Sequence, residues 1–270
     1  MDIEILAIGN ELLLGLIRDA NAHWLSQQIT NVGGTVRRIT LVGDDDLEIS
    51  SVVKDSIARK PDWLITSGGL GPTHDDKTLQ GVAAAFGKKV AVDSVAVEML
   101  KKSYSRHSTN LELNEFRLKM AKIPVGSIPI QNPVGSAPSI LMETASGTKI
   151  VCLPGVPKEM EAVFAESILP RLANTIGEYH VLYADYETSG VTESTLAPIL
   201  SEIIYSNPTH SIYLKSHPRE SVASSSYKND PRLLIQIVSK GKDKLEVKQR
   251  LNNISKIIFE QISKLNGKIL

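Results

Sequence analysis

The chain has 270 residues, which is enough for one large domain or for a main domain with a smaller one beside it. Its 30 basic and 30 acidic residues balance, and no run of like charge is longer than Asp44 to Asp46, which argues against nucleic-acid binding through net charge. No stretch approaches the roughly 18 apolar residues of a membrane span, and no basic segment precedes an apolar one at the N-terminus, so we expect a cytoplasmic protein.

The first part of the chain alternates strand and helix patterns. The strand patterns are residues 3–9, 35–42 and 62–67; one intervening helix has Ala22, Leu25, Ile29 and Val32 on one face, and the next carries Ile49, Val52, Val53 and Ile57. Asp19 is placed to cap the first helix and Gly33-Gly34 to end it. Alternation of this kind predicts a mostly parallel sheet covered on both sides.

A glycine-rich turn, residues 66–78 (TSGGLGPTHDDKT), joins the third strand to a helix carrying Leu79, Val82, Ala83 and Phe86. Gly68, Gly69 and Gly71 let the backbone take positive φ and let an anion approach peptide N–H groups, which favours a phosphate site. Asp75 and Asp76 follow at once, and the alternative for these two residues is that they cap the helix.

Polar residues follow each of the first three strands. Asn10 and Glu11 come after the first strand, Asp44 after the second, and the glycine turn after the third. Because ligands of such sheets bind beyond the carboxyl ends of the strands, we expect these residues to share one crevice.

The remainder of the first domain is predicted as two amphipathic helices over 94–107 and 111–123, the segment 127–132, the loop 132–139 (NPVGSAPS) and two strands around a Ser-Gly turn. The only cysteine, Cys152, lies in the second of these strands and is expected to be a small core residue. A helix starting at Pro157 should bend or stop near Pro170, and the domain boundary should fall near Gly177.

From Tyr179 onward the pattern indicates a small α+β domain: a strand, a helix, two strands and a long helix whose face carries Leu251, Ile254, Ile258 and Ile262. The polar segment 219–230 is expected to be a mobile loop. His107, His180, His210 and His217 have no Cys or His partner at metal-ligand spacing, so no zinc site is predicted.

Five motifs in order, AIGNELLLG, LVGDD, SGGLGPTHDDKT, NPVGSAPS and LPGVPKEM, resemble the competence/damage-inducible CinA family. Residues 1–175 also resemble the molybdopterin-binding domain of the MogA and MoaB proteins, and residues 178–270 resemble the KH-like domain of CinA proteins. The resemblance implies a three-layer α/β sandwich with a mostly parallel sheet, followed by a small α+β KH-like domain. The C-terminal deamidase domain of full-length bacterial members is missing from this sequence, so no deamidase activity is assigned.

For the first domain, the resemblance implies hydrolysis of the pyrophosphate bond of ADP-ribose or a related nucleotide diphosphate with a divalent metal, Mg²⁺, Mn²⁺ or Co²⁺. Asp44 and Asp76 match the family's acidic positions and are assigned as catalytic metal ligands, with Asp75 and Glu11 as further catalytic residues. The alternative for Glu11 is a helix-start or turn acid, and for Asp45 and Asp46 it is capping of the second helix.

The residues assigned to substrate binding lie on the glycine turn, on the 132–139 loop and at the start of the later helix. They are Gly68, Gly69, Gly71, Thr73, Thr78, Asn132, Gly135, Ser136 and Lys158. Asn132 to Gly135 also spell an ordinary turn, and Lys158 could equally be a solvated helix-start lysine.

The second domain has GVTE at Gly190 to Glu193 where RNA-binding KH domains have a GXXG loop, so RNA binding is not expected. A homodimer is expected, with Tyr213, Lys215, His217 and Arg219 as candidates for an inter-domain or inter-subunit contact.

Two alternatives to hydrolysis remain open. The first is a module that binds molybdopterin or adenylylated molybdopterin in cofactor synthesis without hydrolysing it. The second is a structural partner of a separate deamidase.

Overall fold

The computed structural model describes residues 1–106, 113–207, 211–219 and 231–270 and divides the chain into two compact units. The first unit contains Met1–Thr30 and Gly34–Ile176, and the second contains Asn31–Gly33 and Gly177–Leu270. His107, His210 and residues 220–230 of the polar segment expected to be mobile lie outside the described residues.

A six-stranded sheet forms the middle layer of the first unit, in the order β2-β1-β3-β8-β7-β6. Its strands are β1 Asp2–Ile8, β2 Thr35–Val42, β3 Trp63–Ser67, β6 Ile128–Ile130, β7 Ser139–Glu143 and β8 Lys149–Leu153. The first four strands in this order run parallel, and β7 is antiparallel to both of its neighbours. The expected α/β class with a mostly parallel sheet is confirmed.

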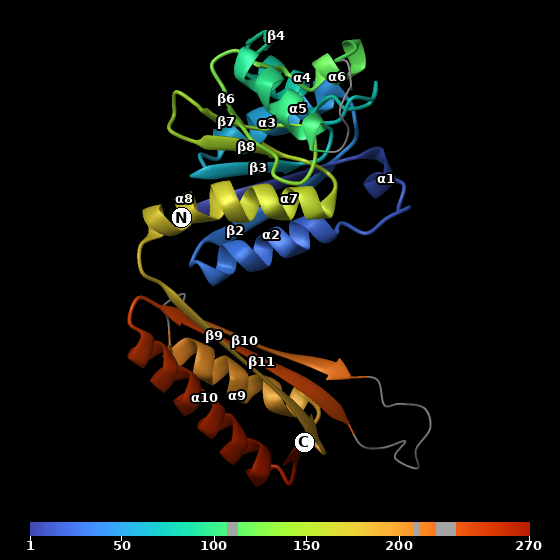
Figure 1. Cartoon of the computed structure of the whole chain (residues 1–270). Coiled ribbons are helices and arrows are strands. Elements are labelled where there is room, and N and C mark those ends of the chain that lie inside the picture. The colour runs from blue at the N-terminus through green and yellow to red at the C-terminus, as the bar shows by residue number, and fades with distance from the viewer. Residues whose placement is uncertain (107–112, 208–210, 220–230) are drawn as a thin grey trace. The chain divides into compact units, whose positions relative to one another are not determined.

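Helices cover both faces of this sheet, as Figure 1 shows, with α2, α7 and α8 on one side and α3, α4 and α5 on the other. The bounds are α1 Asn10–Leu13, α2 Ala20–Asn31, α3 Asp46–Ala58, α4 Thr78–Ala85, α5 Ser94–Ser105, α6 Glu115–Lys119, α7 Pro157–Val163 and α8 Leu169–Ile176. Asp19 accepts a hydrogen bond from Ala22 N (2.9 Å), and Asp45 caps α3 by accepting from Leu47 N and Glu48 N, so capping is confirmed for these two residues. Asp46, the other residue expected to cap α3, is instead the first residue of that helix.

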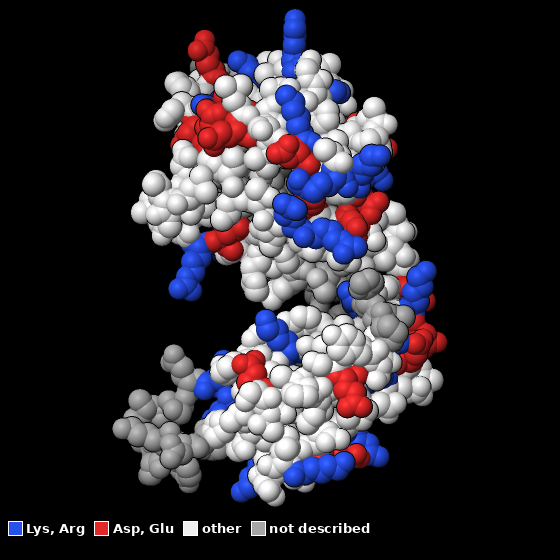
Figure 2. Space-filling model, turned by 180° about the vertical axis from the view of Figure 1, so that it is seen from behind, with Lys and Arg blue, Asp and Glu red and all other residues white. Residues whose placement is uncertain are grey.

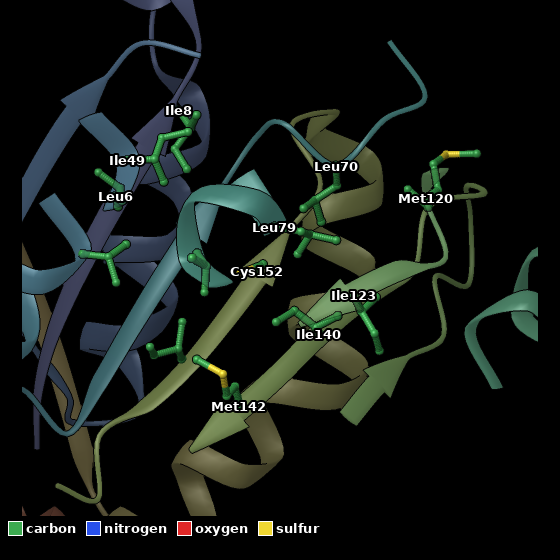
Figure 3. Close-up of a cluster of buried hydrophobic side chains, with 14 of the residues drawn as sticks. Leu6, Ile8, Ile49, Leu70, Leu79, Met120, Ile123, Ile140, Met142 and Cys152 are labelled. Carbon is green, nitrogen blue, oxygen red and sulfur yellow. The ribbon is translucent and has the colours of Figure 1, made fainter. Parts of the chain in front are cut away.

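The core on the α3 and α4 side is continuous from strand to strand (Figure 3). Leu6 from β1, Ile49 from α3, Leu79 from α4 and Ile140 from β7 are at most 5% exposed. Cys152 from β8 lies among them and is fully buried, as expected for a small core residue. Each such Leu or Ile side chain contributes on the order of 2 kcal/mol through burial, which fixes the strands whose ends carry the polar residues.

The prediction of a helix over 111–123 is wrong for most of its described part. Only Glu115–Lys119 is helical, and Lys122–Pro124 forms strand β5, which pairs antiparallel with β4 (Val90–Val92). Asn114 caps the short helix by accepting from Arg117 N. Met120, Ala121 and Ile123 are buried where the chain turns from helix to strand, so apolar spacing alone could not distinguish the two.

The helix that starts at Pro157 does not stop at Pro170. A π-helical stretch, η1 Phe164–Ile168, lies directly before α8, and the helical chain continues to Ile176. A proline lacks a backbone N–H, and the wider π turn places this missing donor where no regular i to i−4 bond is required. The stop expected near this proline is therefore not found, and the helical chain passes it by way of a wider π-helical turn.

The second unit is a four-stranded antiparallel sheet in the order β10-β11-β9-β12, with two helices. Its elements are β9 His180–Ser189, α9 Glu193–Ser206, β10 Ile212–Arg219, β11 Arg232–Gly241, α10 Lys244–Lys264 and β12 Lys268–Ile269. Leu196, Ile235, Ile237 and Ile258 are fully buried in its core. The two-residue strand β12 was not predicted, because two residues carry no periodicity.

Three of the four residues proposed for a contact of the second unit are exposed on the edge strand β10: Tyr213, Lys215 and Arg219. His217 is half-buried, and the contact itself stays a prediction. On the face seen in Figure 2, both units carry acidic and basic side chains. None of the helices in the described ranges is long and apolar enough to cross a membrane.

Candidate functional site

The carboxyl ends of β1 and β2 are tied together by one pair of side chains. Gly9 N donates to Val42 O (3.0 Å), so the two strands are still paired where they end. One residue further, Asn10 N donates to Asp44 Oδ2 (2.7 Å) and Asp44 N donates to Asn10 Oδ1 (3.2 Å). This reciprocal pair fixes the Asp44 carboxylate at the edge of the sheet.

The glycine turn after β3 needs its glycines for steric reasons. Gly68 has φ +111°, and a Cβ there would lie 2.1 Å from Ile8 O. Gly69 has φ +65°, and a Cβ there would lie 2.3 Å from Thr78 Oγ1. No side chain fits either position, so the backbone of this turn can pack directly on β1.

Thr78, the first residue of α4, holds the turn from behind. Its hydroxyl donates to Gly68 O (2.7 Å) and its N–H donates to Gly69 O (3.2 Å). Both carbonyls therefore point away from the outer side of the turn. In the part of the chain that the structure describes, the N–H groups of Gly69, Leu70 and Gly71 have no hydrogen-bond acceptor. Consecutive unpaired N–H groups of this kind form an anion-binding concavity.

The loop that follows gathers two carboxylates around one hydroxyl. Thr73 Oγ1 lies 2.5 Å from Asp75 Oδ1 and 2.5 Å from Asp76 Oδ2, and Thr73 N donates to Asp76 Oδ2 (2.8 Å). The hydroxyl lowers the pKa of Asp75 below its ordinary value. Because these carboxylates are bound within the loop and the N-cap of α4 is Lys77 without a side-chain bond, the capping alternative for Asp75 and Asp76 is wrong.

Lys119 joins this loop from the end of α6. Its ammonium group donates to Thr73 O, and burial lowers its pKa, although the charges of Asp76 and Asp75 act in the opposite direction. The loop carboxylates are thus balanced in part by one lysine that is itself half-buried.

Asp44 is the carboxylate of the cleft whose pKa is raised above its ordinary value. Burial raises its pKa, and the negative charges of Glu11, Asp75 and Asp76 raise it further, against the hydrogen bond from Asn10 N. A carboxylate whose pKa is raised by burial and by neighbouring acids is typical of a functional site.

A second wall is built around the fully buried Asn132. Its amide donates to Glu159 Oε2 (2.6 Å) and to Ala137 O (3.2 Å), and its Oδ1 accepts from Val134 N (3.1 Å) and Gly135 N (2.7 Å). The loop from Asn132 to Ala137 is therefore folded around its own first side chain. Glu159, from the first turn of α7, lies against it.

The two walls enclose a cleft of about 760 Å³. Ten of the predicted site residues line it: Glu11, Asp44, Gly68, Gly69, Gly71, Thr73, Asp75, Asp76, Gly135 and Ser136. Residues that follow three different strands thus meet at one place, as expected from their positions in the sequence. Glu11 is also in the first turn of α1, so its helix-start alternative holds at the same time.

Three predicted residues do not line the cleft. Thr78 and Asn132 are fully buried behind its two walls and shape it through hydrogen bonds. Lys158 is exposed on α7, on the side opposite Met160, which faces the core. This position fits the alternative interpretation of Lys158, a solvent-exposed lysine at the start of a helix.

The cleft also contains residues that were not predicted, among them Tyr104, Met120, Val134 and Glu159. Tyr104 and Met120 come from segments whose apolar spacing indicates only burial. Glu159 had a usable signal, since the helical spacing from the buried Met160 and Val163 places it at the flank of the core face and Lys158 opposite that face.

A divalent cation fits the donors of this cleft only with help from its ligand. Among the described residues, no three His, Cys, Asp or Glu side chains are grouped closely enough to hold a metal ion alone. Magnesium commonly binds through one or two carboxylates together with water and phosphate oxygens. Asp44 and Asp76, the predicted metal ligands, both line the cleft.

Comparison with known proteins places the first unit in a family. Residues 4–174 match the model of the "probable molybdopterin binding domain". A protein of Sulfurisphaera tokodaii is 38% identical over 267 residues, 99% of this chain and 97% of that protein. A protein of Pyrococcus horikoshii is 45% identical over 206 residues, 74% of this chain and 79% of that protein.

One solved structure, of the protein CinA with unknown function from Thermoplasma acidophilum, is 39% identical with a TM-score of 0.57. The match covers 65% of this chain and 99% of that protein. The chain therefore belongs to the molybdopterin-binding domain family, among its CinA-type members.

Proposed function

We propose that the cleft binds a phosphorylated pterin of the molybdopterin type, or a related nucleotide, through its phosphate groups. The observation that carries this proposal is the row of unpaired N–H groups at Gly69, Leu70 and Gly71 on the wall of the cleft. The family match supports the pterin as the ligand class. The cleft volume of about 760 Å³ lies within the range of small-molecule sites.

Binding of inorganic pyrophosphate and of 6-hydroxymethylpterin diphosphate, measured by calorimetry, tests the proposal. Pro72→Asp adds a carboxylate to the cleft wall next to Gly71, and His74→Asp adds one in the same loop outside the cleft. His74 is 97% exposed, so it serves as the matched control. We expect Pro72→Asp to weaken both ligands by about tenfold or more and His74→Asp to change them by less than about twofold.

Absence of binding by the unmodified protein would overturn the proposal. Equal weakening by both variants would also count against it, because the effect would then come from the charge of the loop rather than from the cleft.

A second candidate function is metal-dependent hydrolysis of a pyrophosphate bond, as in ADP-ribose. The observation that favours it is the set of acids Glu11, Asp44, Asp75 and Asp76 beside the N–H groups, with the pKa of Asp44 raised by burial and by the other three. Asp44 and Asp76 would hold the ion, which neutralises phosphoryl charge and activates water when bound.

Release of AMP and ribose 5-phosphate from ADP-ribose tests this second function. The reaction is run with Mg²⁺, Mn²⁺, Co²⁺ or chelator, beside Asp76→Asn. We expect turnover that depends on the metal and is lost in the variant, while the far-ultraviolet circular dichroism stays unchanged. No turnover with any metal would leave ligand binding as the function of the cleft.

A further inference from the structure

Glu159 is a cleft residue that neither phosphate binding nor metal binding uses. It lies in the wall formed by α7 and the loop from Asn132 to Ala137, whereas the unpaired N–H groups and the other acids belong to the glycine-turn wall. In the residues that the structure describes, its carboxylate has one hydrogen-bond donor, Asn132, and no ion pair.

The position of this carboxylate is fixed from two sides. Asn132 uses both amide hydrogens and its oxygen in four hydrogen bonds, so its own side chain cannot turn. Gly135 provides the space, since a Cβ there would lie 2.0 Å from the Glu159 carboxylate. Glu159 is therefore a half-buried carboxylate whose position in the wall of the cleft is fixed by Asn132 and by the space at Gly135.

The cleft that Glu159 lines also has apolar and aromatic surface for a ring. Tyr104, Met120 and Val134 line the same cleft and offer apolar or aromatic surface. The Tyr104 ring is itself supported by the Arg117 guanidinium, 5.0 Å from its centroid. A carboxylate that lines the same cleft can accept N–H groups that lie in the plane of a bound ring.

We propose that Glu159 recognises the ring of the ligand by accepting two N–H groups from a 2-amino-4-oxopyrimidine edge. Pterins and guanine share this edge, on which a ring N–H and the 2-amino group point in the same direction. Adenine places a ring nitrogen lone pair beside its amino group, so the carboxylate would face a lone pair. This inference rests on the proposed binding of a phosphorylated pterin or related nucleotide in the cleft and adds the residue that recognises its ring.

Calorimetry with ligands that differ only at the ring edge tests the inference. GDP offers the ring N–H and the 2-amino group, IDP offers only the ring N–H, and ADP has a ring nitrogen lone pair in place of the ring N–H. We expect GDP to bind about tenfold or more tightly than ADP, with IDP in between. In Glu159→Gln, which keeps an acceptor for Asn132, GDP should weaken to about the affinity of ADP, and inorganic pyrophosphate should be unaffected.

Glu161→Gln is the matched control, because it makes the same change two residues further along α7 and outside the cleft. It should leave all affinities unchanged. 6-Hydroxymethylpterin diphosphate distinguishes the two kinds of ligand that carry this ring edge. If it binds more tightly than GDP, the site is assigned to pterins, and if it binds more weakly, the site is assigned to guanine nucleotides. Either result supports recognition of this edge.

The two proposals fail in different ways. If inorganic pyrophosphate does not bind, the phosphate site itself is overturned. If pyrophosphate binds and ADP binds as tightly as GDP, or if Glu159→Gln keeps the preference for GDP, only the role of Glu159 is overturned.

Discussion

The two units of the chain place their backbone polar groups very differently. In the second unit, β9 and β11 are paired antiparallel over all ten residues of each strand, and their N–H and C=O groups are used within the sheet. In the first unit the parallel strands end at Ile8, Val42 and Ser67, and the chain continues into turns whose N–H groups lie at a cleft. The ends of a parallel sheet leave donors for a ligand that a long antiparallel ladder does not.

The same contrast extends to buried charge. The first unit buries Glu4, which accepts from Arg59 Nε (2.7 Å) and Ser56 Oγ (2.8 Å). In the described residues of the second unit, the buried polar side chains are only serines and a threonine. The stability of the first unit thus depends in part on a buried ion pair and its hydrogen bonds, whereas that of the second unit depends on regular strand pairing and apolar packing.

The largest expected effect comes from Gly68→Ala compared with Gly190→Ala. Both glycines follow a strand and have positive φ, +111° and +79°. A Cβ at Gly68 would lie 2.1 Å from Ile8 O, but at Gly190 the nearest atom is 3.4 Å away. We expect a loss of about 4 kcal/mol of unfolding free energy at Gly68 and of about 1 kcal/mol at Gly190.

Urea unfolding measures the first value, since both tryptophans, Trp24 and Trp63, are in the first unit. Amide hydrogen exchange of β11 and α10 measures the second. Equal losses would mean that close backbone approach does not distinguish the two units.

The next effect is that of Arg59→Met, which leaves Glu4 buried without its partner. We expect a loss of about 3 kcal/mol near pH 7, against less than about 0.5 kcal/mol for Arg250→Met, whose partner Glu246 is exposed on α10. Tryptophan fluorescence in urea reports the first loss, and amide hydrogen exchange of α10 reports the second.

This loss should depend on pH in a defined direction. Burial raises the pKa of Glu4, but Arg59 and Ser56 outweigh it and the pKa is lowered overall. The stabilisation is therefore present above the unfolded pKa, about 4.3, and is lost as the pH falls through the lowered folded pKa. A penalty for Arg59→Met that stays constant down to pH 2 would contradict this account.

Helix caps should show no difference between the units. Asp93 caps α5 by accepting from Ala96 N (2.8 Å), and Asp243 caps α10 by accepting from Glu246 N (2.9 Å). Asp93→Ala and Asp243→Ala should each cost about 1 kcal/mol. The same two probes, tryptophan fluorescence and amide exchange of α10, measure them. Unequal costs would show that even local contacts depend on the unit.

The smallest effect is a gain in stability. The pKa of Asp44 is higher in the folded protein than in the unfolded chain. The contribution of Asp44 to the unfolding free energy is therefore favourable below its pKa in the unfolded chain, about 3.9, and is lost as the pH rises through its pKa in the folded protein. Asp44→Asn should therefore raise the unfolding free energy at pH 7 by less than about 1 kcal/mol, and the gain should vanish near pH 3. Thermal unfolding at the two pH values measures it, and a destabilised variant at pH 7 would contradict it.

The sequence was sufficient to predict features that depend on neighbouring residues. The caps Asp19 and Asp45 and the strand-to-helix glycine turn follow from local rules, and the parallel sheet follows from alternation of apolar patterns. The meeting of Glu11, Asp44 and Asp76 at one cleft followed from the rule that strand ends share an edge.

Features that depend on contacts across the fold could not be predicted in the same way. Whether Thr78 and Asn132 contact a ligand or support a wall depends on which side of a turn faces the core. Strand β5 was assigned to a helix because its partner β4 lies about 30 residues earlier and leaves no local signal. Glu159 was overlooked, although helical spacing places it at the flank of the core face of α7, because a single acid in a first helical turn is common on any surface.

Cys152 gives the chain an internal chemical reporter. It lies opposite Thr66 of β3 on one side and Ile140 of β7 on the other, and burial raises the pKa of its thiol to about 12. At neutral pH the folded protein therefore offers an alkylating reagent neither access nor thiolate. Since this is the only cysteine in the sequence, the rate at which the protein is labelled should report how often the middle of the sheet opens, and a ligand that binds in the cleft of the folded unit should slow that rate.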